Sequence, residues 1–353
     1  MAAGPRIIDR LATAIARIFY RVDAAGSVPA SGPLLLLPNH PNALLDPALV
    51  MATAGRPVRF LAKSTLFKGP FSPLLRAAAA IPVYRRQDGA DVERNEEAFA
   101  AVHAALARGE AVCIFPEGIS HSSGRLEPLR TGAARIALSA SAAGVRVQLV
   151  AVGINLEKKT TFRSRATVAY GHPFTVPRSL AGTRNPVKEI TNLIADHMRR
   201  VLIEADPHTE AWIVERVDNL YRSERSVDDD ALGTVERKRI IAGTLRRLRT
   251  ERSGWYEDAL VQFRRYDDRL RRFGLHDRAL DWNASASEVR AFVLRELPLA
   301  LLLGPLSALA LLIFVVPYTL TAMVSRVVKD MDVTATAKVV AGAVIYGIWT
   351  LLL

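Results

Sequence analysis

Cysteine is almost absent from this chain of 353 residues, and acidic side chains are in deficit. The one cysteine, Cys113, cannot form a disulfide within the chain, and nothing indicates an oxidising compartment. Lys and Arg total 47 against 35 Asp and Glu, which gives a formal net charge of +12. Such an excess favours a polyanionic neighbour, either a nucleic acid or the anionic face of a bilayer. The length suffices for one large domain with an appendage or for two domains.

Several familiar motifs are missing as well. The sequence has no Gly-x-Ser-x-Gly nucleophile turn, no phosphate loop ending in Gly-Lys-Ser/Thr and no dinucleotide-binding glycine fingerprint. It has no His-Glu-x-x-His helix, and one cysteine cannot build a cysteine zinc site, so we expect no metal and no cofactor. Cys113 lies in an apolar run, which favours a core position over a nucleophile. We interpret the scattered histidines as structural or exposed: His121, His172, His197 and His208.

What the chain does have is an alternation of short apolar runs and Ala- and Leu-rich stretches of helical period. This alternation predicts an α/β fold, with a mixed sheet covered by helices. The expected strands are 34–37, 58–61, 82–84, 111–115 and 145–154, with 166–170 as a candidate last strand. The expected helices between them are 47–53, 73–80, 92–107 and 131–142.

The segments before and after this unit have a different composition. Residues 1–24 predict an amphipathic helix, which either lies in a membrane interface or packs on the core of its own domain. We place the α/β domain at 25–180 and a charged helical region at 181–296. Within that region, 237–272 holds twelve Lys or Arg and five Asp or Glu residues. These side chains form either a solvated face of long helices, a surface against anionic headgroups or, with no motif to support it, a nucleic-acid surface.

Residues 297–353 predict membrane helices. No charged residue or histidine occurs from Leu297 to Ser325, a run of 29 residues that is long enough to span a bilayer with tilt or to form a hairpin that dips into it. A second apolar run, 339–353, reaches spanning length only if 333–338 joins it, with Lys338 extending to the interface. Because Lys and Arg abound before the first run, we expect the α/β domain on the cytoplasmic side.

A histidine and an aspartate follow the first expected strand. In the segment 38–47, His40 comes directly after the strand, and Asp46 precedes Pro47 and is a candidate helix N-cap. A carboxylate beside a histidine can hold one ring nitrogen and leave the other to take a proton. Taken alone, the pair is also compatible with a loop histidine and a plain cap.

Two further strands end in chemically distinctive residues. Arg85 and Arg86 follow one of them and could bind a phosphate, although alone they are more typical of surface charges. The run Phe115-Pro116-Glu117-Gly118-Ile119-Ser120 follows another and predicts a tight turn that carries Glu117. We expect Glu117, His40 and Arg85 at one edge of the sheet.

In this order and spacing, the blocks resemble the glycerol-phosphate and lysophosphatidic acid acyltransferase superfamily over about residues 30–175. That family carries a His and Asp motif, a strand ending in Arg, a Phe-Pro-Glu-Gly turn with a following Ser or Thr, and a strand like Val-Pro-Val-Gly. This chain has five residues between His40 and Asp46 where four are usual, and Ala151-Val152-Gly153 where a proline is common. The five-residue spacing is similar to that of the fungal-type glycerol-3-phosphate and dihydroxyacetone-phosphate acyltransferase subset.

The resemblance implies a role for each block. His40 would be the general base, oriented by Asp46, and Asn42 would help to hold their turn. Arg85, with Arg86, would bind the acceptor phosphate. The residues implied in shaping the acceptor site are Phe115, Pro116, Glu117, Gly118 and Ser120.

The expected activity is transfer of a fatty-acyl group in phospholipid synthesis. Acyl-CoA or acyl-carrier protein would be the co-substrate, and the acceptor would be glycerol 3-phosphate, dihydroxyacetone phosphate or, for the second acylation, lysophosphatidic acid. Expected partners are these substrates and membrane lipids, with no nucleic acid. One alternative is a catalytically silent lipid-binding protein on the same fold, and another is a membrane-tethered nucleic-acid binder that rests only on the charge.

Overall fold

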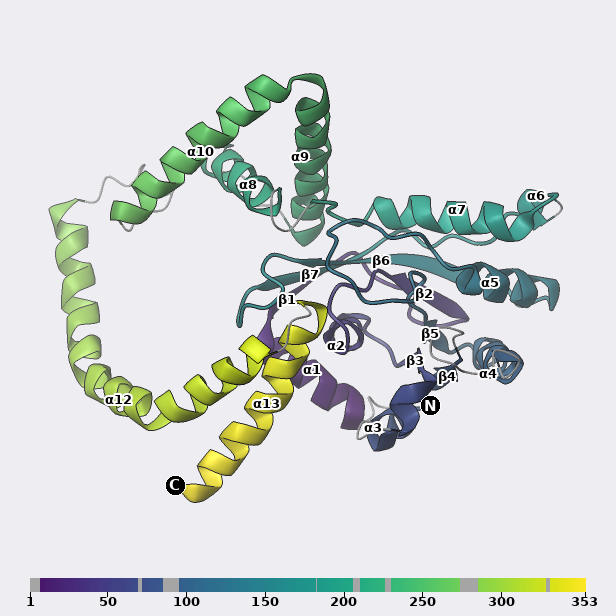
Figure 1. The fold of residues 1–353 in the computed structure, drawn as a ribbon, viewed down its shortest axis with the longest axis horizontal. Coiled ribbons are helices and arrows are strands. Elements are labelled where there is room, and N and C mark those ends of the chain that lie inside the picture. The colour runs from purple at the N-terminus through teal and green to yellow at the C-terminus, as the bar shows by residue number, and fades with distance from the viewer. Residues whose placement is uncertain are drawn as a thin grey trace.

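The α/β architecture is confirmed in the computed structural model (Figure 1). The structure describes residues 7–68, 72–84, 95–181, 183–205, 210–225, 230–273, 285–327 and 331–353. Seven strands in this part of the chain form one sheet in the order β1-β7-β6-β2-β5-β3-β4. The strands are β1 (Arg21–Ala25), β2 (Leu34–Pro38), β3 (Val58–Lys63), β4 (Ile81–Val83), β5 (Ala111–Cys113), β6 (Gln148–Leu156) and β7 (Arg165–Tyr170).

The sheet is mixed, because β6 and β7 pair antiparallel while every other neighbouring pair is parallel. The central strands β2 and β5 pair with Leu34 opposite Ala111 and Leu36 opposite Cys113. Parallel strands bring their carboxyl ends to one edge, so the segments that follow β2 and β5 emerge side by side.

Helices cover both faces of the sheet, and β2 shows how one strand serves both. Its side chains alternate, so that Leu35 and Leu37 join one core cluster and Leu34 and Leu36 join the other. The helices of the first cluster are α4 (Asn95–Ala107), α5 (Gly132–Ala142) and α7 (Pro186–Arg199). Those of the second are α1 (Ile7–Phe19) and α2 (Leu45–Thr53). A continuous apolar run is what a strand buried on both faces requires.

Short elements complete the domain. They are a 3-10 turn η1 (Ser64–Lys68), α3 (Ser72–Ala77) and α6 (Arg178–Ala181). The structure also corrects one expectation: residues 1–24 are not wholly helical, because α1 ends at Phe19 and β1 begins at Arg21 and pairs with β7. Five residues of β1 pair with β7. The helical spacing of apolar residues in the preceding segment hid the change from helix to strand.

The core continues beyond residue 180, where we placed the end of the α/β domain. Ile190, Ile194 and Met198 of α7 are fully buried against the sheet. Three long helices follow: α8 (Ala211–Arg225), α9 (Ala231–Glu251) and α10 (Ser253–Phe273). Val235 of α9 also belongs to the larger core cluster. The charged region is helical, as predicted, and its first helix is an integral layer of the domain.

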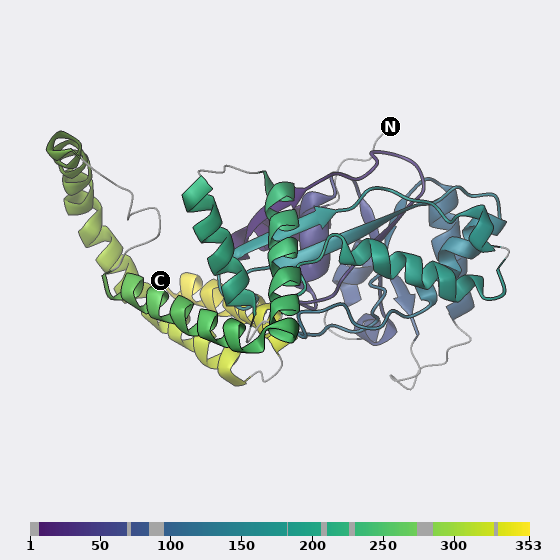
Figure 2. The same cartoon turned by 90° about the horizontal axis from the view of Figure 1, so that it is seen from above.

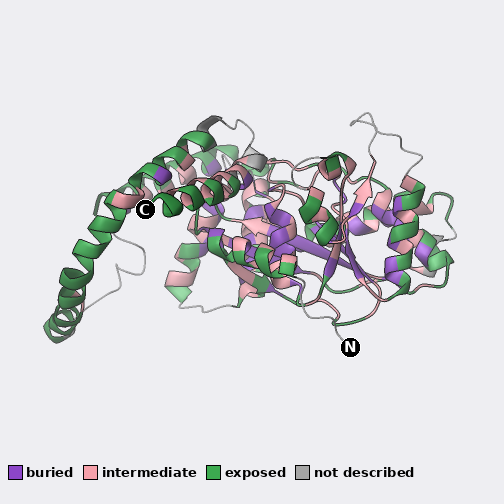
Figure 3. Ribbon diagram, turned by 90° about the horizontal axis from the view of Figure 1, so that it is seen from below, coloured by how far each residue is buried: buried purple, intermediate pink, exposed green. Residues whose placement is uncertain are grey.

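Two helices make up the last part of the chain. Residues 286–327 form α12 (Ala286–Val327), with Pro298, Pro305 and Pro317 inside it, and α13 (Met331–Leu352) follows. One helix of the described residues, Val289–Val324, is long and apolar enough to cross a membrane. An apolar stretch of 18 residues within it has no buried residue. Figure 3 shows the exposed surface along α12, which extends away from the sheet domain in Figures 1 and 2.

The second of these helices begins against the sheet domain. Lys338 Nζ donates a hydrogen bond of 2.7 Å to the carbonyl oxygen of Thr160, in the loop between β6 and β7. Val339 packs on the core cluster that contains α1 and α2. The start of α13 is therefore attached to the folded domain, and Lys338 is used for that attachment.

Candidate active site

His40 and Asp46 meet beyond the carboxyl end of β2. His40 Nδ1 lies 2.8 Å from Asp46 Oδ2. The His40 side chain is 19% exposed, whereas that of Asp46 is fully buried. The imidazole also stacks on the ring of Phe115, with centroids 4.1 Å apart and planes 23° apart. A donor at Nδ1 leaves Nε2 as an acceptor, which is the tautomer that a general base needs.

The turn between the two residues is held at both ends. The backbone N–H of Asn42 donates to Asp46 Oδ2 at 2.6 Å, and the N–H of Ala43 donates to Ser120 Oγ at 3.0 Å. Ala43 has φ of 40°, a left-handed conformation that costs free energy in a residue other than glycine. These bonds hold the strained turn, so Asn42 and Ser120 contribute to the shape of the loop that presents His40.

Asp46 is not the helix N-cap that we expected. The helix α2 begins at Leu45 and its N-cap is Leu44, so that Asp46 lies in the first turn. The carboxylate is instead directed at His40 and at the backbone of Asn42. Burial raises the pKa of Asp46, and the bonds from His40 and Asn42 partly offset that rise. Asp46 therefore pairs with His40 and does not cap α2, because it lies inside the first turn of the helix.

The segment 115–120 lies beside this turn because β5 neighbours β2. Gly118 has φ of 73°, and a Cβ there would come within 3.1 Å of Arg130 Cγ, so the position requires glycine. The carbonyl oxygen of Pro116 accepts from the N–H of Arg130 at 2.7 Å. Phe115 is placed against the His40 ring, where it packs on the proposed catalytic base.

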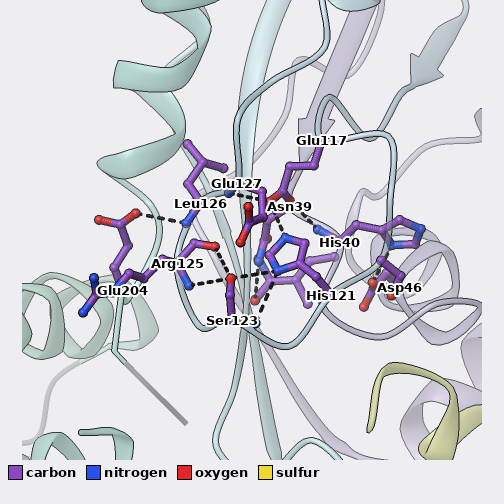
Figure 4. Close-up of polar contacts among 12 residues, drawn as sticks. Asn39, His40, Asp46, Glu117, His121, Ser123, Arg125, Leu126, Glu127 and Glu204 are labelled. Carbon is purple, nitrogen blue, oxygen red and sulfur yellow. Dashed lines mark hydrogen bonds and ion pairs between the residues drawn. The ribbon is translucent and has the colours of Figure 1, made fainter. Parts of the chain in front are cut away.

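Glu117 has a different set of partners from the one that the resemblance implied. Its side chain is fully buried. Oε1 accepts from the backbone N–H of His40 at 2.9 Å, and Oε2 accepts from the backbone N–H of Glu127 at 2.9 Å and pairs with His121 Nε2. Its carboxylate thus binds the protein's own backbone, and Figure 4 shows it between His40 and His121. We interpret Glu117 as a residue that holds the catalytic loop; the role implied by the resemblance stays a prediction.

His121 is the residue that sequence reasoning missed, since we interpreted it as structural or exposed. It contacts His40 from the other side, because its N–H donates to the carbonyl oxygen of His40 at 3.1 Å. Burial lowers the pKa of His121, but the hydrogen bond to Glu117 and the charges of Glu117 and Glu127 outweigh it, so that the pKa is raised overall. The separation of four residues between Glu117 and His121 was the available signal, but it predicts contact only in a helix, and this segment is a loop.

Tyr20 joins the turn to a distant loop. Its hydroxyl accepts from Asn42 Nδ2 at 2.6 Å and donates to the carbonyl oxygen of Lys159. Burial, together with the charge of Asp46, raises the pKa of Tyr20, which keeps the hydroxyl protonated and able to donate. The side-chain atoms Asn42 Oδ1 and Asp46 Oδ1 are buried without a hydrogen bond among the described residues.

Two predicted residues cannot be placed. Arg85 and Arg86 lie outside the described residues, so their assignment to the acceptor phosphate stays a prediction. Cys113, in contrast, is buried in β5, and burial raises the pKa of its thiol, as expected for a core residue. Among the described residues, no group of three or more His, Cys, Asp or Glu side chains is placed to hold a metal ion.

A cavity of about 420 Å³ adjoins the His40 loop. Its wall includes Asn39, Pro41, His121 and Lys159 from the loops, and residues of β6, β7, α8 and α9 complete it. It therefore reaches His121 and the residues on both sides of His40.

The segment that holds this site is similar to known proteins. The acyltransferase family matches residues 20–155, which include both blocks of the site. Glycerol-3-phosphate O-acyltransferase 1 of Saccharomyces cerevisiae is 32% identical over 130 residues, which cover 34% of this chain and 17% of that protein. Glycerol-3-phosphate O-acyltransferase 2 of the same yeast is 30% identical over 135 residues, covering 36% and 18%. The chain thus matches less than a fifth of the length of these curated relatives.

A solved structure was also found, that of the 1-acyl-sn-glycerophosphate (LPA) acyltransferase PlsC from Thermotoga maritima. It has a TM-score of 0.41 and 20% identity, and covers 54% of this chain and 76% of that one. The His40–Asp46 pair lies within the segment that matches the acyltransferase family. Residues 20–155 of the chain are similar to the acyltransferase family.

Proposed function

We propose that this protein transfers a fatty-acyl group from a thioester to a hydroxyl of a glycerol-phosphate acceptor, as a step of glycerolipid synthesis. The observation that carries the proposal is the contact of His40 Nδ1 with the buried carboxylate of Asp46. It is supported by the similarity of about 130 residues of this chain to the two yeast glycerol-3-phosphate O-acyltransferases.

The chemistry needs one base and no covalent enzyme intermediate. His40 Nε2 takes the proton of the acceptor hydroxyl while that oxygen attacks the thioester carbonyl carbon. The new C–O bond forms, the C–S bond breaks, and the proton on His40 passes to the departing thiolate. Asp46 holds the ring and stabilises the imidazolium that forms. Such proton transfer contributes about two to four orders of magnitude in rate, and positioning of the two substrates supplies more.

The thioester is carried by coenzyme A or acyl-carrier protein, and the acceptor is glycerol 3-phosphate, dihydroxyacetone phosphate or lysophosphatidic acid. The five-residue spacing between His40 and Asp46 favours the first two acceptors, through the fungal-type subset that it resembles. We assign phosphate binding to Arg85 with Arg86. No metal, cofactor or nucleic acid takes part in the proposal.

We also propose that the protein works at a membrane, with the acyltransferase domain on the cytoplasmic side. The long apolar helix α12 supports attachment, and so does α1. Ile7, Leu11 and Ile18 of α1 are 85%, 51% and 63% exposed, while Ala16 and Phe19 of the same helix are buried against the domain. The two interpretations of this helix are therefore compatible, because one face can pack on the core and the other can enter the interface.

The test is acyl transfer by the purified, detergent-solubilised protein from a labelled palmitoyl thioester, with either carrier, to the three acceptors. Transfer to glycerol 3-phosphate or dihydroxyacetone phosphate, abolished in His40→Ala, is the expected result. Transfer to lysophosphatidic acid alone would assign the second acylation. No transfer from either donor to any acceptor would favour a lipid-binding protein on this fold, and near wild-type turnover by His40→Ala would refute the mechanism.

A further inference from the structure

We propose that His121 is a positioning residue for the catalytic base. Together with Glu117, it holds the backbone N–H and C=O of His40. The proposal rests on the proposed function in one respect, since it assigns the base to His40. It concerns a residue for which the blocks of the family resemblance imply no role.

Glu117 and His121 each hydrogen-bond one backbone group of His40. Its N–H donates to Glu117 Oε1 at 2.9 Å, and its carbonyl oxygen accepts from the N–H of His121 at 3.1 Å. The ring of His121 also pairs with the other oxygen of Glu117 (Figure 4). The three residues are therefore joined in a closed set of contacts. A shift of the 117–121 segment would therefore move both backbone groups of His40 at once.

Glu117 needs this partner because its side chain is fully buried. A buried carboxylate is unstable unless hydrogen bonds and a positive charge compensate for lost hydration. Two backbone N–H groups, from His40 and Glu127, supply part of that compensation. Among the described residues, the side chain that pairs with Glu117 is that of His121.

The contacts of His121 Nδ1 bear on whether the imidazole is neutral or charged. Nδ1 lies 2.9 Å from Ser123 Oγ, and that hydroxyl donates its one proton to the carbonyl oxygen of Arg125 at 3.0 Å. With its proton used in that bond, Ser123 Oγ is an acceptor for Nδ1–H, and both ring nitrogens are then donors, as in imidazolium. In a competing contact, the N–H of Ser123 donates to Nδ1 at the longer distance of 3.4 Å, as it would to a neutral ring. The charged groups that act on this ring are Glu117, Glu127 and Lys159.

The consequence for catalysis is geometric. His40 Nε2 must stand within hydrogen-bond reach of the acceptor hydroxyl, and a displacement of about 1 Å can lower the rate about 100-fold. The ring has its own supports in Asp46 and Phe115, which fix its orientation relative to the turn. Glu117 and His121 fix the turn itself relative to the sheet.

The experiment compares His121→Ala with the wild-type protein in kcat, in KM for both substrates and in chemical rescue. We expect kcat to fall about 10- to 100-fold with little change in either KM, because the substrates do not depend on His121 for binding. His121 lines the cavity of about 420 Å³, so added imidazole can enter the space that the substitution leaves. Rescue should follow the fraction of imidazole that is protonated, and so weaken as pH rises.

The matched control is His103→Gln. His103 is in α4, and its Nε2 also bonds a serine, Ser139 Oγ of α5, at 2.7 Å. We expect wild-type kcat for this variant. A kcat for His121→Ala within threefold of wild type, or a fall in kcat that imidazole does not reverse, would overturn the proposal. If His121→Ala does not fold, His121→Gln replaces it, because glutamine keeps a hydrogen-bond donor near Glu117 without the charge. Its kcat should be below that of the wild type but measurable, and the pH dependence that comes from His121 should be absent.

An activity-independent measurement separates this proposal from the proposed function. The Nδ1 proton that His40 shares with Asp46 should give a strongly downfield proton resonance, assigned by its loss in His40→Ala. We expect that resonance to shift or broaden in His121→Ala and to be unchanged in His103→Gln. An unchanged resonance in both would refute positioning by His121, whether or not acyl transfer is detected. A disturbed resonance without any transfer would leave positioning supported and refute the activity.

Discussion

At the scale of single residues, the site is a set of side chains that hold one imidazole. Asp46 Oδ2 receives both His40 Nδ1 and the N–H of Asn42, at 2.8 Å and 2.6 Å. In the proposed mechanism, the charge on this buried carboxylate stabilises the imidazolium that forms during proton transfer. Asp46 therefore acts on the reaction through His40, whereas its neighbours Asn42 and Ser120 act on the shape of the turn.

Asp46→Asn should lower kcat by about two to four orders of magnitude, because the amide cannot stabilise the imidazolium and can favour the wrong tautomer. KM for the acceptor should change little. Steady-state kinetics with saturating thioester measure both. The comparison is Asn42→Ala, which removes a bond to the Tyr20 hydroxyl but leaves the carboxylate of Asp46 in place. Its kcat should fall less than that of Asp46→Asn. Equal losses in the two variants would contradict the role assigned to Asp46.

His121 should make stability depend on pH. Its pKa in the folded protein lies above the ordinary value of 6.5 that it regains on unfolding. The unfolded chain therefore releases this proton first as pH rises. The stabilisation from the charged His121 is complete below about pH 6.5 and is lost as pH rises through the folded-state pKa.

Thermal unfolding followed against pH tests this expectation. From pH 6.5 upward, the unfolding temperature of the wild-type protein should fall more steeply than that of His121→Gln, which has no titrating group there. His103→Gln serves again as the control and should follow the wild type. Parallel curves for wild type and His121→Gln would show that His121 is not charged in the folded protein.

At the scale of elements, one glycine decides how closely β6 can approach the segment after α7. A Cβ on Gly153 would lie 2.0 Å from the carbonyl oxygen of Val201, and a backbone atom cannot move aside as a flexible side chain can. Asn155 fastens the same contact, since its Nδ2 donates to Val201 at 3.0 Å and its Oδ1 accepts from Ile203 at 2.9 Å. Glycine is thus required for packing at this position of the fourth sequence block.

Gly153→Ala should destabilise the protein by about 1–3 kcal/mol, the usual range for an overpacked core. The control is Gly243→Ala in α9, where a Cβ would meet nothing within 4 Å and helix propensity should stabilise by about 0.5–1 kcal/mol. Thermal unfolding in the same detergent measures both variants. A neutral Gly153→Ala would mean that the Val201 segment can move away without loss.

The basic helices after α7 hold many of their charges in pairs. Between different helices, Arg216 bonds Asp267 and Arg237 bonds Asp218, each at 2.6 Å, and Lys238 bonds Glu215 at 2.5 Å. Arg237 and Lys238 are only 15% and 6% exposed at the side chain. This pairing favours the interpretation of the region as helices packed through their polar faces, over a uniformly free basic surface.

At the scale of the whole molecule, the apolar helix α12 should determine membrane attachment. Leu306 lies near the middle of Val289–Val324 and is 63% exposed. Leu306→Arg should make insertion less favourable by about 2.5–3.5 kcal/mol, the amount for an arginine at the centre of a span. The fraction of protein that resists alkaline carbonate extraction of membranes should therefore decrease.

Leu232→Arg is the matched control, because it adds the same charge at a leucine of α9 that is 44% exposed. We expect it to leave extraction unchanged. A Leu306→Arg protein that stays fully in the membrane fraction would show that α1, α13 or other segments suffice for attachment.

Much of the fold followed from the sequence, because buried strands and amphipathic helices have distinct local periods. The expected strands at 34–37 and 166–170 differ from β2 and β7 by one residue at most, and the meeting of His40 with Glu117 followed from the parallel pairing of β2 with β5. Local pattern was insufficient for β1, whose identity as a strand depends on its pairing with β7, more than 140 residues away.

The sequence by itself determined the class of fold, the apolar C-terminal helices and the residues His40 and Asp46, because each depends on residue type and spacing within a short segment. Only the tertiary structure decided that Asp46 is not a helix cap, that Glu117 binds the backbone of His40, and that His121 belongs to the site. The reason is physical: a hydrogen bond depends on distance and direction in space, and the loops that place these groups are held by contacts between segments that are distant in the chain.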